Sequence, residues 1–136
     1  MAVADTSNGI FSTLAVPITS TSVYVLVDTI IVPPLLRGKP MILYGVTGSA
    51  GALNGLKMTE ATTPGGTHVT TKTDADFNTP DSQMVQTSYT GSNPPYQTAL
   101  SSSFWLKFAN APCEFAIYAK KATADVTLAI SGTVLR

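Results

Sequence analysis

Three oxygen-bearing side chains alternate along the chain, at Asp74, Asp76 and Asn78. Hard cations such as Ca²⁺ prefer carboxylate and carbonyl oxygens on a flexible loop, so these residues are weak candidates for a metal site. The run departs from an EF-hand calcium loop, because Thr79 stands where that loop needs glycine and Val85 where it needs the closing glutamate. We therefore predict no metal or other cofactor. We interpret the run as a surface turn in which Asp and Asn side chains bond their own backbone.

The residues that nucleophilic catalysis needs are sparse and poorly placed. Histidine, the usual general base, occurs only at His68, in a Gly- and Thr-rich run that predicts an exposed loop or strand. A nucleophile elbow needs glycine two residues before and after its serine, and Thr47 occupies the first of these positions around Ser49. The single cysteine, Cys113, precedes Glu114, whose charge disfavours a reactive thiolate. The sequence therefore predicts no catalytic residue, and we expect that the protein is not an enzyme.

Two tyrosines, Tyr89 and Tyr96, bracket a turn that contains Pro94 and Pro95. Exposed aromatic rings beside Asn could stack on a sugar, and tyrosine is also a frequent anchor in protein interfaces. The same rings could instead pack on their own strands and make the loop rigid. Ligand contact, subunit contact and packing within the chain all remain open for this pair.

The charge balance argues against two classes of partner. Lys and Arg number 8, as do Asp and Glu, so the formal net charge is zero. Proteins that bind nucleic acid or anionic membranes usually carry an excess of positive charge, which this chain lacks. We therefore predict that neither nucleic acid nor a membrane is a partner. Charged residues make up only 12% of the chain, about half of the ~25% typical of soluble domains, and 20 Thr and 12 Ser take over part of the solvation. Such a neutral surface tends to associate, which predicts a homo-oligomer; a low-charge monomer is the alternative.

Runs rich in Val, Ile, Thr, Tyr and Phe alternate with Gly, Pro, Asn and Ser clusters, which is typical of strands and turns. We predict an all-β protein: a single jelly-roll-like β-sandwich over residues 1–136, with about eight antiparallel strands. Candidate strands lie near residues 10–16, 22–32, 40–47, 52–59, 67–72, 83–90, 98–109, 114–121 and 124–135. The last three are expected to form an antiparallel meander. The glycine-rich residues 45–82 are expected to form long exposed loops with a weak hairpin.

The segment 22–32 is apolar on both sides when it is drawn as a strand. One face would carry Val23, Val25, Val27 and Ile31, and the other Tyr24, Leu26, Ile30 and Val32. Such a strand is either covered by a neighbouring segment of its own chain or contacts another subunit. We predict a subunit interface here, formed by Val23, Val25, Val27, Pro33, Pro34, Leu35 and Leu36.

The N-terminus has no basic region followed by a sustained apolar run, so we expect no secretory signal, and one cysteine allows no internal disulfide. Residues 1–9 are expected to be an extended segment that could lie on a shell. With the Thr/Ser/Gly-rich β pattern, these features resemble small decoration or cement proteins of tailed-phage heads. The resemblance covers the general character of the whole chain and rests on no particular motif.

Membership of that group would imply a symmetric homo-oligomer, usually a trimer, that binds the major capsid protein and stabilises the virion shell. The protein would then be assembled in the host cytoplasm and end up in the virion. The alternative is a carbohydrate- or receptor-binding β-sandwich, such as a fibre or tail component. In that case Tyr89, Tyr96 and the acidic turn would form the contact surface.

Overall fold

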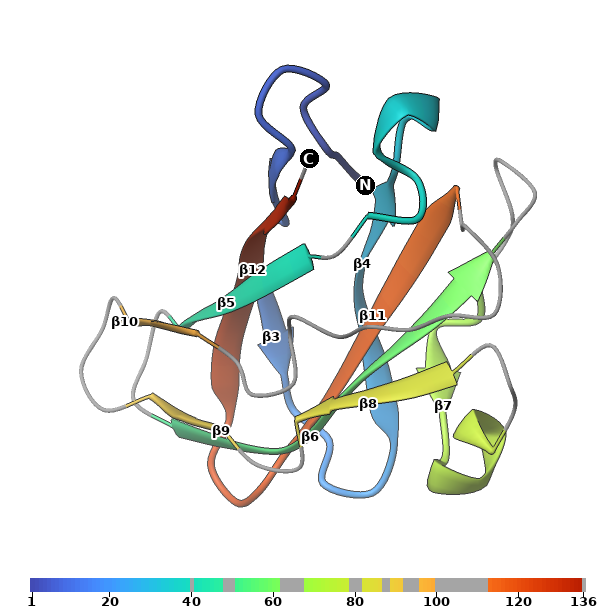
Figure 1. Ribbon diagram of the computed structural model, residues 1–136. Helices are drawn as coiled ribbons and strands as arrows, with labels where there is room; N and C mark the ends of the chain where they lie inside the picture. Colours follow the sequence, from blue (N-terminus) through green and yellow to red (C-terminus); the bar gives the residue numbers. More distant parts are fainter. Residues whose placement is uncertain are drawn as a thin grey trace.

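Two β-sheets pack face to face around one main core (Figure 1). This computed structural model describes residues 1–39, 41–47, 51–61, 68–78, 82–86, 89–91, 96–99 and 113–135. The prediction of an all-β, sandwich-like fold is confirmed, whereas the jelly-roll order of the strands stays a prediction.

The first sheet has seven strands. Its order is β1-β4-β11-β6-β8, with β7 beside β4 and β9 beside β6. The strands are β1 (Ala2–Val3), β4 (Tyr24–Ile31), β6 (Gly51–Ala61), β7 (Thr71–Lys72), β8 (Ser82–Gln86), β9 (Tyr89–Gly91) and β11 (Glu114–Lys121). All neighbours are antiparallel except β1 and β4, which run parallel.

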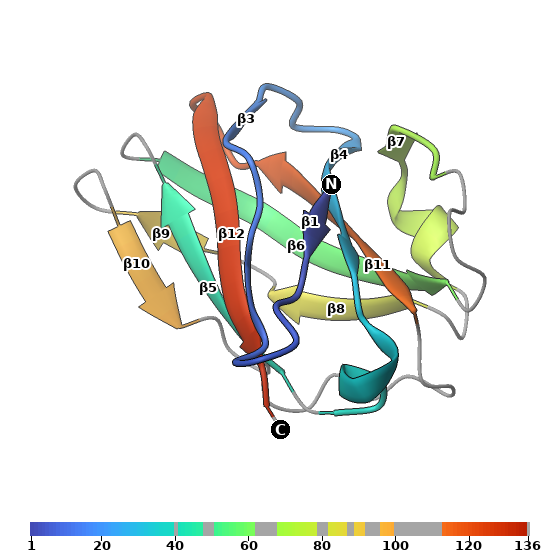
Figure 2. The ribbon, with the colours of Figure 1, turned by 90° about the horizontal axis from the view of Figure 1, so that it is seen from above.

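The second sheet has five strands, all antiparallel, in the order β10-β5-β12-β2 with β3 also beside β12. They are β2 (Ile10–Ser12), β3 (Val16–Ile18), β5 (Met41–Thr47), β10 (Tyr96–Ala99) and β12 (Val126–Val134). Two short 3₁₀ helices complete the described residues: η1 (Pro34–Leu36) follows β4, and η2 (Asp74–Phe77) follows β7. Figure 2 shows the two layers from above.

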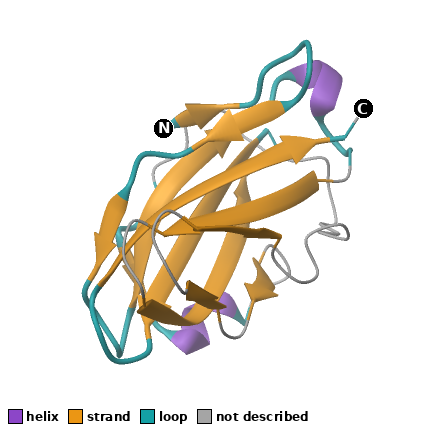
Figure 3. Cartoon of the chain, turned by 90° about the vertical axis from the view of Figure 1, so that its left-hand side faces the viewer, coloured by secondary structure: helices purple, strands orange, loops and turns teal. Residues whose placement is uncertain are grey.

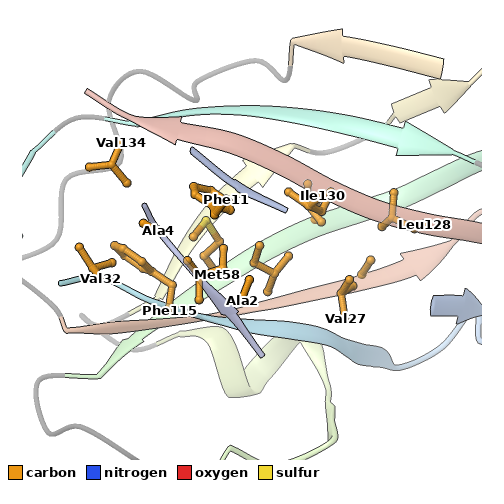
Figure 4. Packing of buried hydrophobic residues seen from close by; sticks show 14 of the residues in the cluster. Ala2, Ala4, Phe11, Val27, Val32, Met58, Phe115, Leu128, Ile130 and Val134 are labelled. Carbon is orange, nitrogen blue, oxygen red and sulfur yellow. The ribbon is translucent and has the colours of Figure 1, made fainter. Parts of the chain in front are cut away.

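Both sheets contribute to the main core, in which side chains of β12 face those of β6 and β11 (Figure 4). In β12 the buried residues Val126, Leu128 and Ile130 alternate with more exposed ones, as the sequence pattern predicts. Burying apolar surface stabilises the fold by roughly 25 cal/mol per Å², so this alternation fixes which face of β12 turns inward.

The expectation of exposed loops over residues 45–82 is wrong for β6. This strand lies inside the seven-stranded sheet, between β11 and β8, and buries Leu53, Leu56 and Met58 in the core. The candidate strand near residues 52–59 corresponds to β6, and Gly55 within it is required by packing, because the Tyr24 ring lies where a side chain would be. The acidic turn does lie on the surface: Asp74 and Asp76 are exposed on η2.

The predicted meander at the C-terminal end is also wrong. β11 and β12 follow one another closely, yet β11 pairs with β4 and β6 while β12 pairs with β5, β2 and β3. A short connection looks alike in sequence whether the strand returns beside its neighbour or crosses to the opposite sheet. Of the third candidate, 98–109, residues 98–99 belong to β10 and the rest lie outside the described residues.

In β4 an extra residue changes which side chains share a face. Leu26 pairs with Tyr118 and Asp28 with Ile117, so Val27 is a bulge. A bulge reverses the alternation of the strand beyond it. Ile30 and Val32 therefore join the main core and do not share the face of Tyr24 and Leu26, as the uninterrupted pattern predicted.

Candidate functional site

The most unusual surface of the described residues is formed by residues 1–14, which we call the N-terminal ribbon. It runs along one side of the sandwich, with β1 on the edge of the seven-stranded sheet and β2 on the edge of the five-stranded sheet (Figure 2). The two strands contact each other, and a turn over residues 5–9 joins them. The ribbon therefore closes the gap between the two sheets.

Buried and exposed residues alternate along both halves of the ribbon. The inward residues are Ala2, Ala4, Phe11 and Thr13. Large apolar side chains point outward, with exposed fractions of 72% for Met1, 54% for Val3, 53% for Ile10 and 76% for Leu14. Ser12 completes the outward row. This apolar outer row was missed from the sequence, because Ile10 and Phe11 are both apolar and alternation alone does not say which faces inward.

The inward side of the ribbon is firmly attached to the domain. Figure 4 shows Ala2, Ala4 and Phe11 within the core cluster. The backbone N–H of Thr13 donates to the carbonyl oxygen of Ile130 at 2.8 Å, and the Thr13 hydroxyl accepts from the N–H of Ile130 at 2.8 Å. Residues 1–9, which we expected to be an extended segment, form a strand only at β1 and then a turn, and Ala2 and Ala4 pack into the core of their own domain.

The turn of the ribbon is specified by local hydrogen bonds. The Asp5 carboxylate accepts bonds from the hydroxyl and the backbone N–H of Ser7, which hold its pKa below the usual range. Gly9 adopts a positive φ of 73°, and a Cβ there would overlap the carbonyl oxygen of Val134. The turn therefore packs directly on the end of β12, which fixes the position of the ribbon.

Next to this turn lies η1, which carries part of the predicted subunit interface (Figures 1 and 3). Leu35 is 74% exposed, as an interface residue should be, and Pro34 is exposed and Pro33 half-buried. Leu36 is 1% exposed and belongs to the core, so its assignment to an interface is wrong. Two adjacent leucines on one helical turn point in different directions, which sequence spacing alone did not resolve.

The valines of β4, and Val23 directly before it, do not form an open surface. Val27 is buried in the main core, so its assignment to an interface is also wrong, and Val23 and Val25 are half-buried. The opposite face of the strand is covered by residues 68–78 of the same chain, because Phe77 of η2 packs on Tyr24 and Tyr118 with ring centroids 5.1 and 5.4 Å apart. The segment 22–32 was expected either to be covered by its own chain or to contact another subunit. On this face of β4, the first alternative holds.

Three lysines surround these rings and complete what we call the lysine–aromatic cluster. The Lys57 ammonium lies 4.9 Å from the ring centres of both Tyr24 and Phe77, and the Lys120 ammonium 4.8 Å from that of Tyr24. Lys72 lies 5.3 Å from the centre of Phe77. Such cation–π contacts contribute about 0.5–2 kcal/mol, more when they are desolvated.

Asp74 neutralises part of this charge and links η2 to the sheet. Its carboxylate oxygens accept from Lys57 at 3.2 Å and from Lys120 at 3.1 Å. The bond from Lys120, followed by that from Lys57, lowers the pKa of Asp74. Burial, and secondarily the charge of Asp74, raises the pKa of Tyr24 to about 12, and burial raises the pKa of Tyr118 to about 12.

The weak metal candidates are engaged in these and similar contacts. Asp74 binds the two lysines, and Asp76 accepts from the N–H and hydroxyl of Thr73 at 2.8 and 3.1 Å in a capping box, which lowers its pKa. Asn78 lies at the C-terminal end of η2, where its backbone N–H donates to Ala75. The interpretation as a turn with side chains bonded to their own backbone holds for Asp76 and is wrong for Asp74.

His68 lies in a different environment from the one predicted. It is largely buried, and its Nε2 lies 2.8 Å from Oε2 of the buried Glu114. Cys113 is buried as well. The contact between His68 and Glu114 joins the segment before β7 to the start of β11, and the two residues are 46 positions apart in the sequence. Proximity of this kind depends on which strands pair, so the exposed position expected from the flanking glycines is wrong.

The two tyrosines proposed for ligand contact belong to different sheets. Tyr89 is in β9 and pairs with Leu53, whereas Tyr96 is in β10 and pairs with Thr47. The prolines between them, and Ser49, lie outside the described residues. The tyrosine contact surface therefore stays a prediction.

No family model, no curated protein and no solved structure matches this chain. Over the described ranges, no three His, Cys, Asp or Glu side chains are grouped so that they could hold a metal ion. In the same part of the chain, no helix is long and apolar enough to cross a membrane.

Proposed function

We propose that this protein is a structural subunit that works through surface contacts in an ordered assembly, as a decoration protein on a virion shell does. The observation that carries the proposal is the apolar outer row of the N-terminal ribbon. The described residues bury one main core, yet Met1, Val3, Ile10 and Leu14 stay exposed on the same ribbon. Contiguous exposed apolar side chains of this kind mark interaction surfaces.

The rest of the surface suits the same role. A shell component needs many preformed contacts that symmetry multiplies, and neutral apolar or hydroxyl-bearing surfaces form such contacts with little desolvation cost for charge. With only 12% charged residues and no net charge, this chain meets that condition. The partners in this proposal are further copies of the chain and the major capsid protein of the shell.

The solution mass tests the proposal. We would measure it by light scattering coupled to size exclusion over a wide range of protein concentration. A discrete multiple of the 14.2 kDa chain would support a role as an assembly subunit. A mass of 14.2 kDa at every concentration would contradict self-assembly.

A further inference from the structure

Residues 68–78, which we call the strap, lie on the outer face of the seven-stranded sheet. They contain β7 and η2, and Figure 2 shows both on the side of this sheet away from β12. Phe77 is the most buried residue of the strap, and most of the others are exposed. Beneath the strap, Tyr24 and Tyr118 are only 2% and 0% exposed. The strap therefore covers an aromatic surface of the sheet while it buries little of itself.

The apolar contact of the strap is separate from the main core. Phe77 belongs to a second, smaller cluster with Tyr24, Ala116 and Tyr118. The main core uses the opposite face of the same strand β11, through Ile117 and Ala119, because side chains alternate along a strand. Displacement of the strap would therefore uncover the smaller cluster and leave the main core filled.

Short backbone contacts attach the strap to the sheet. β7 contributes two residues to its pairing with β4. The backbone N–H of Leu26 donates to the carbonyl oxygen of Thr70 at 2.9 Å, and the Tyr118 hydroxyl donates to that of Val69 at 2.8 Å. Segments with few buried apolar contacts open at a smaller free energy than the whole domain unfolds. We therefore expect the strap to open while the sandwich stays folded.

Two side chains of η2, three residues apart, make the specific contacts. The Phe77 ring packs on both tyrosines, and the Asp74 carboxylate accepts from Lys57 at 3.2 Å and from Lys120 at 3.1 Å. The carboxylate is 64% exposed, whereas each lysine side chain is only 11% exposed. Because the lysines belong to β6 and β11, their charges remain in place when the strap leaves. Nearly buried cations that lose their anion favour binding of another one.

We propose that the strap is a displaceable internal ligand, and that the sheet face beneath it binds a partner segment that presents a carboxylate and an aromatic ring three residues apart. Asp74 and Phe77 show this chemistry in the chain itself: the carboxylate meets the two lysines and the ring meets the two tyrosines. The strap then acts as an autoinhibitory contact. Its displacement needs no contact of the N-terminal ribbon, so this proposal and the structural role can fail separately.

A peptide with the sequence of residues 68–78, labelled with a fluorophore, tests the site by fluorescence anisotropy. The receptor is the full chain with Asp74→Asn/Phe77→Ala, whose own strap lacks both specific contacts. We expect its dissociation constant for the peptide to be at least about tenfold lower than that of the wild type. A tethered ligand acts at an effective concentration on the order of millimolar, so the intact strap of the wild type competes with the peptide.

Two altered peptides provide matched controls. Asp74→Asn and Asp76→Asn remove the same charge from the peptide, but Asp76 bonds the N–H and hydroxyl of Thr73 within η2 and not the lysines. The Asp76→Asn peptide should therefore bind more tightly than the Asp74→Asn peptide. Equal affinities of the two would overturn the role of the carboxylate.

Hydrogen exchange of the wild type measures opening of the strap without any substitution. The amide of Leu26 is bonded to Thr70 of the strap, whereas the amides of β11 lie between β4 and β6. We expect protection of the Leu26 amide to be at least about tenfold lower than that of the β11 amides, and to be insensitive to urea below the unfolding transition.

Peptide binding by the folded variant together with low protection at Leu26 supports the proposal. A dimer of the wild type that excess peptide dissociates would place the strap of a second copy on the site, and it supports the same chemistry. No binding to the folded variant, or equal protection of Leu26 and β11, overturns the proposal. So does loss of the whole fold in Asp74→Asn/Phe77→Ala, checked by circular dichroism, because the strap would then be inseparable from the sandwich.

Discussion

Gly55 in β6 lies directly against the side chain of Tyr24 in β4. A Cβ on Gly55 would come to 2.9 Å from Cε1 of the tyrosine ring and closer still to its hydroxyl. Gly55 also has a φ of 141°, a conformation that residues with side chains rarely adopt. The Tyr24 ring can occupy this place in the lysine–aromatic cluster because β6, which lies beyond β11 in the sheet, has no side chain at position 55.

We therefore expect Gly55→Ala to be strongly destabilising. The added methyl must displace the buried Tyr24 ring or strain the backbone of β6, and such overpacking costs about 1–3 kcal/mol. The measurement is the free energy of unfolding from urea titration. The neighbouring exposed residue provides the control, since Asn54→Ala removes no buried contact. Equal stability of the two variants would contradict the close contact.

Asp74→Asn tests the link between η2 and the two lysines. The pKa of Asp74 is lower in the folded state than in the unfolded state, so its carboxylate stabilises the fold at neutral pH, and this contribution disappears as the pH falls through the lowered pKa. We expect the melting temperature of Asp74→Asn to lie below that of the wild type at pH 7 and the two to converge in acid. The side chain of Asp74 is 64% exposed, so solvent screening keeps the effect modest.

The control for that experiment is Asp125→Asn, which removes the exposed ion pair between Asp125 and Lys121. Exposed pairs of this kind contribute about 0–1 kcal/mol. If Asp125→Asn lowers the melting temperature as much as Asp74→Asn, the contact of Asp74 with two lysines stabilises the fold no more than an exposed ion pair does.

The buried tyrosines predict a loss of stability in alkali. The pKa values of Tyr24 and Tyr118 are raised to about 12 in the folded state, from 10.0. Their neutral forms therefore stabilise the fold fully below pH 10, and this contribution declines as the pH rises from about 10 to about 12. Thermal melts across that range, read by circular dichroism, should show the decline.

Tyr118→Phe separates the titration from other alkaline effects. At pH 7 the variant should lose about 1 kcal/mol, because it lacks the hydrogen bond from the hydroxyl to the carbonyl oxygen of Val69, 2.8 Å long. Between pH 10 and 12 it should lose less stability than the wild type, since one titrating group is gone. An alkaline decline identical to that of the wild type would exclude Tyr118 as its source.

Leu35 and Leu36 should respond oppositely to truncation. Leu36→Ala removes a core side chain and should cost about 2–5 kcal/mol, whereas Leu35→Ala, at an exposed site, should change the free energy of unfolding by less than about 0.5 kcal/mol. Urea titration of both variants measures the difference. Similar losses of unfolding free energy in the two variants would contradict the buried position of Leu36 and the exposed position of Leu35.

The local patterns of the sequence were sufficient to predict strands over most of the described chain. β-branched and aromatic runs between turn residues identified β4, β5, β11 and β12 within a few residues of their bounds, and the alternation in β12 identified its buried face. These features depend on each residue and its near neighbours, because side chains of a strand alternate whatever the strand pairs with.

The remaining features of the fold and of the candidate site depend on pairing between strands that are distant in the sequence. Only the folded chain places His68 on Glu114, Phe77 between Tyr24 and Tyr118, and the ribbon along the edges of both sheets. The candidate strand near residues 52–59 already contained Gly55, but only the Tyr24 ring, which lies against it in the folded sheet, explains why glycine is needed there. The same holds for the outer row of the ribbon: four apolar residues gave no sign in the sequence that they would remain exposed. Exposure is set by which surfaces the other strands leave uncovered, and that is a property of tertiary contacts alone.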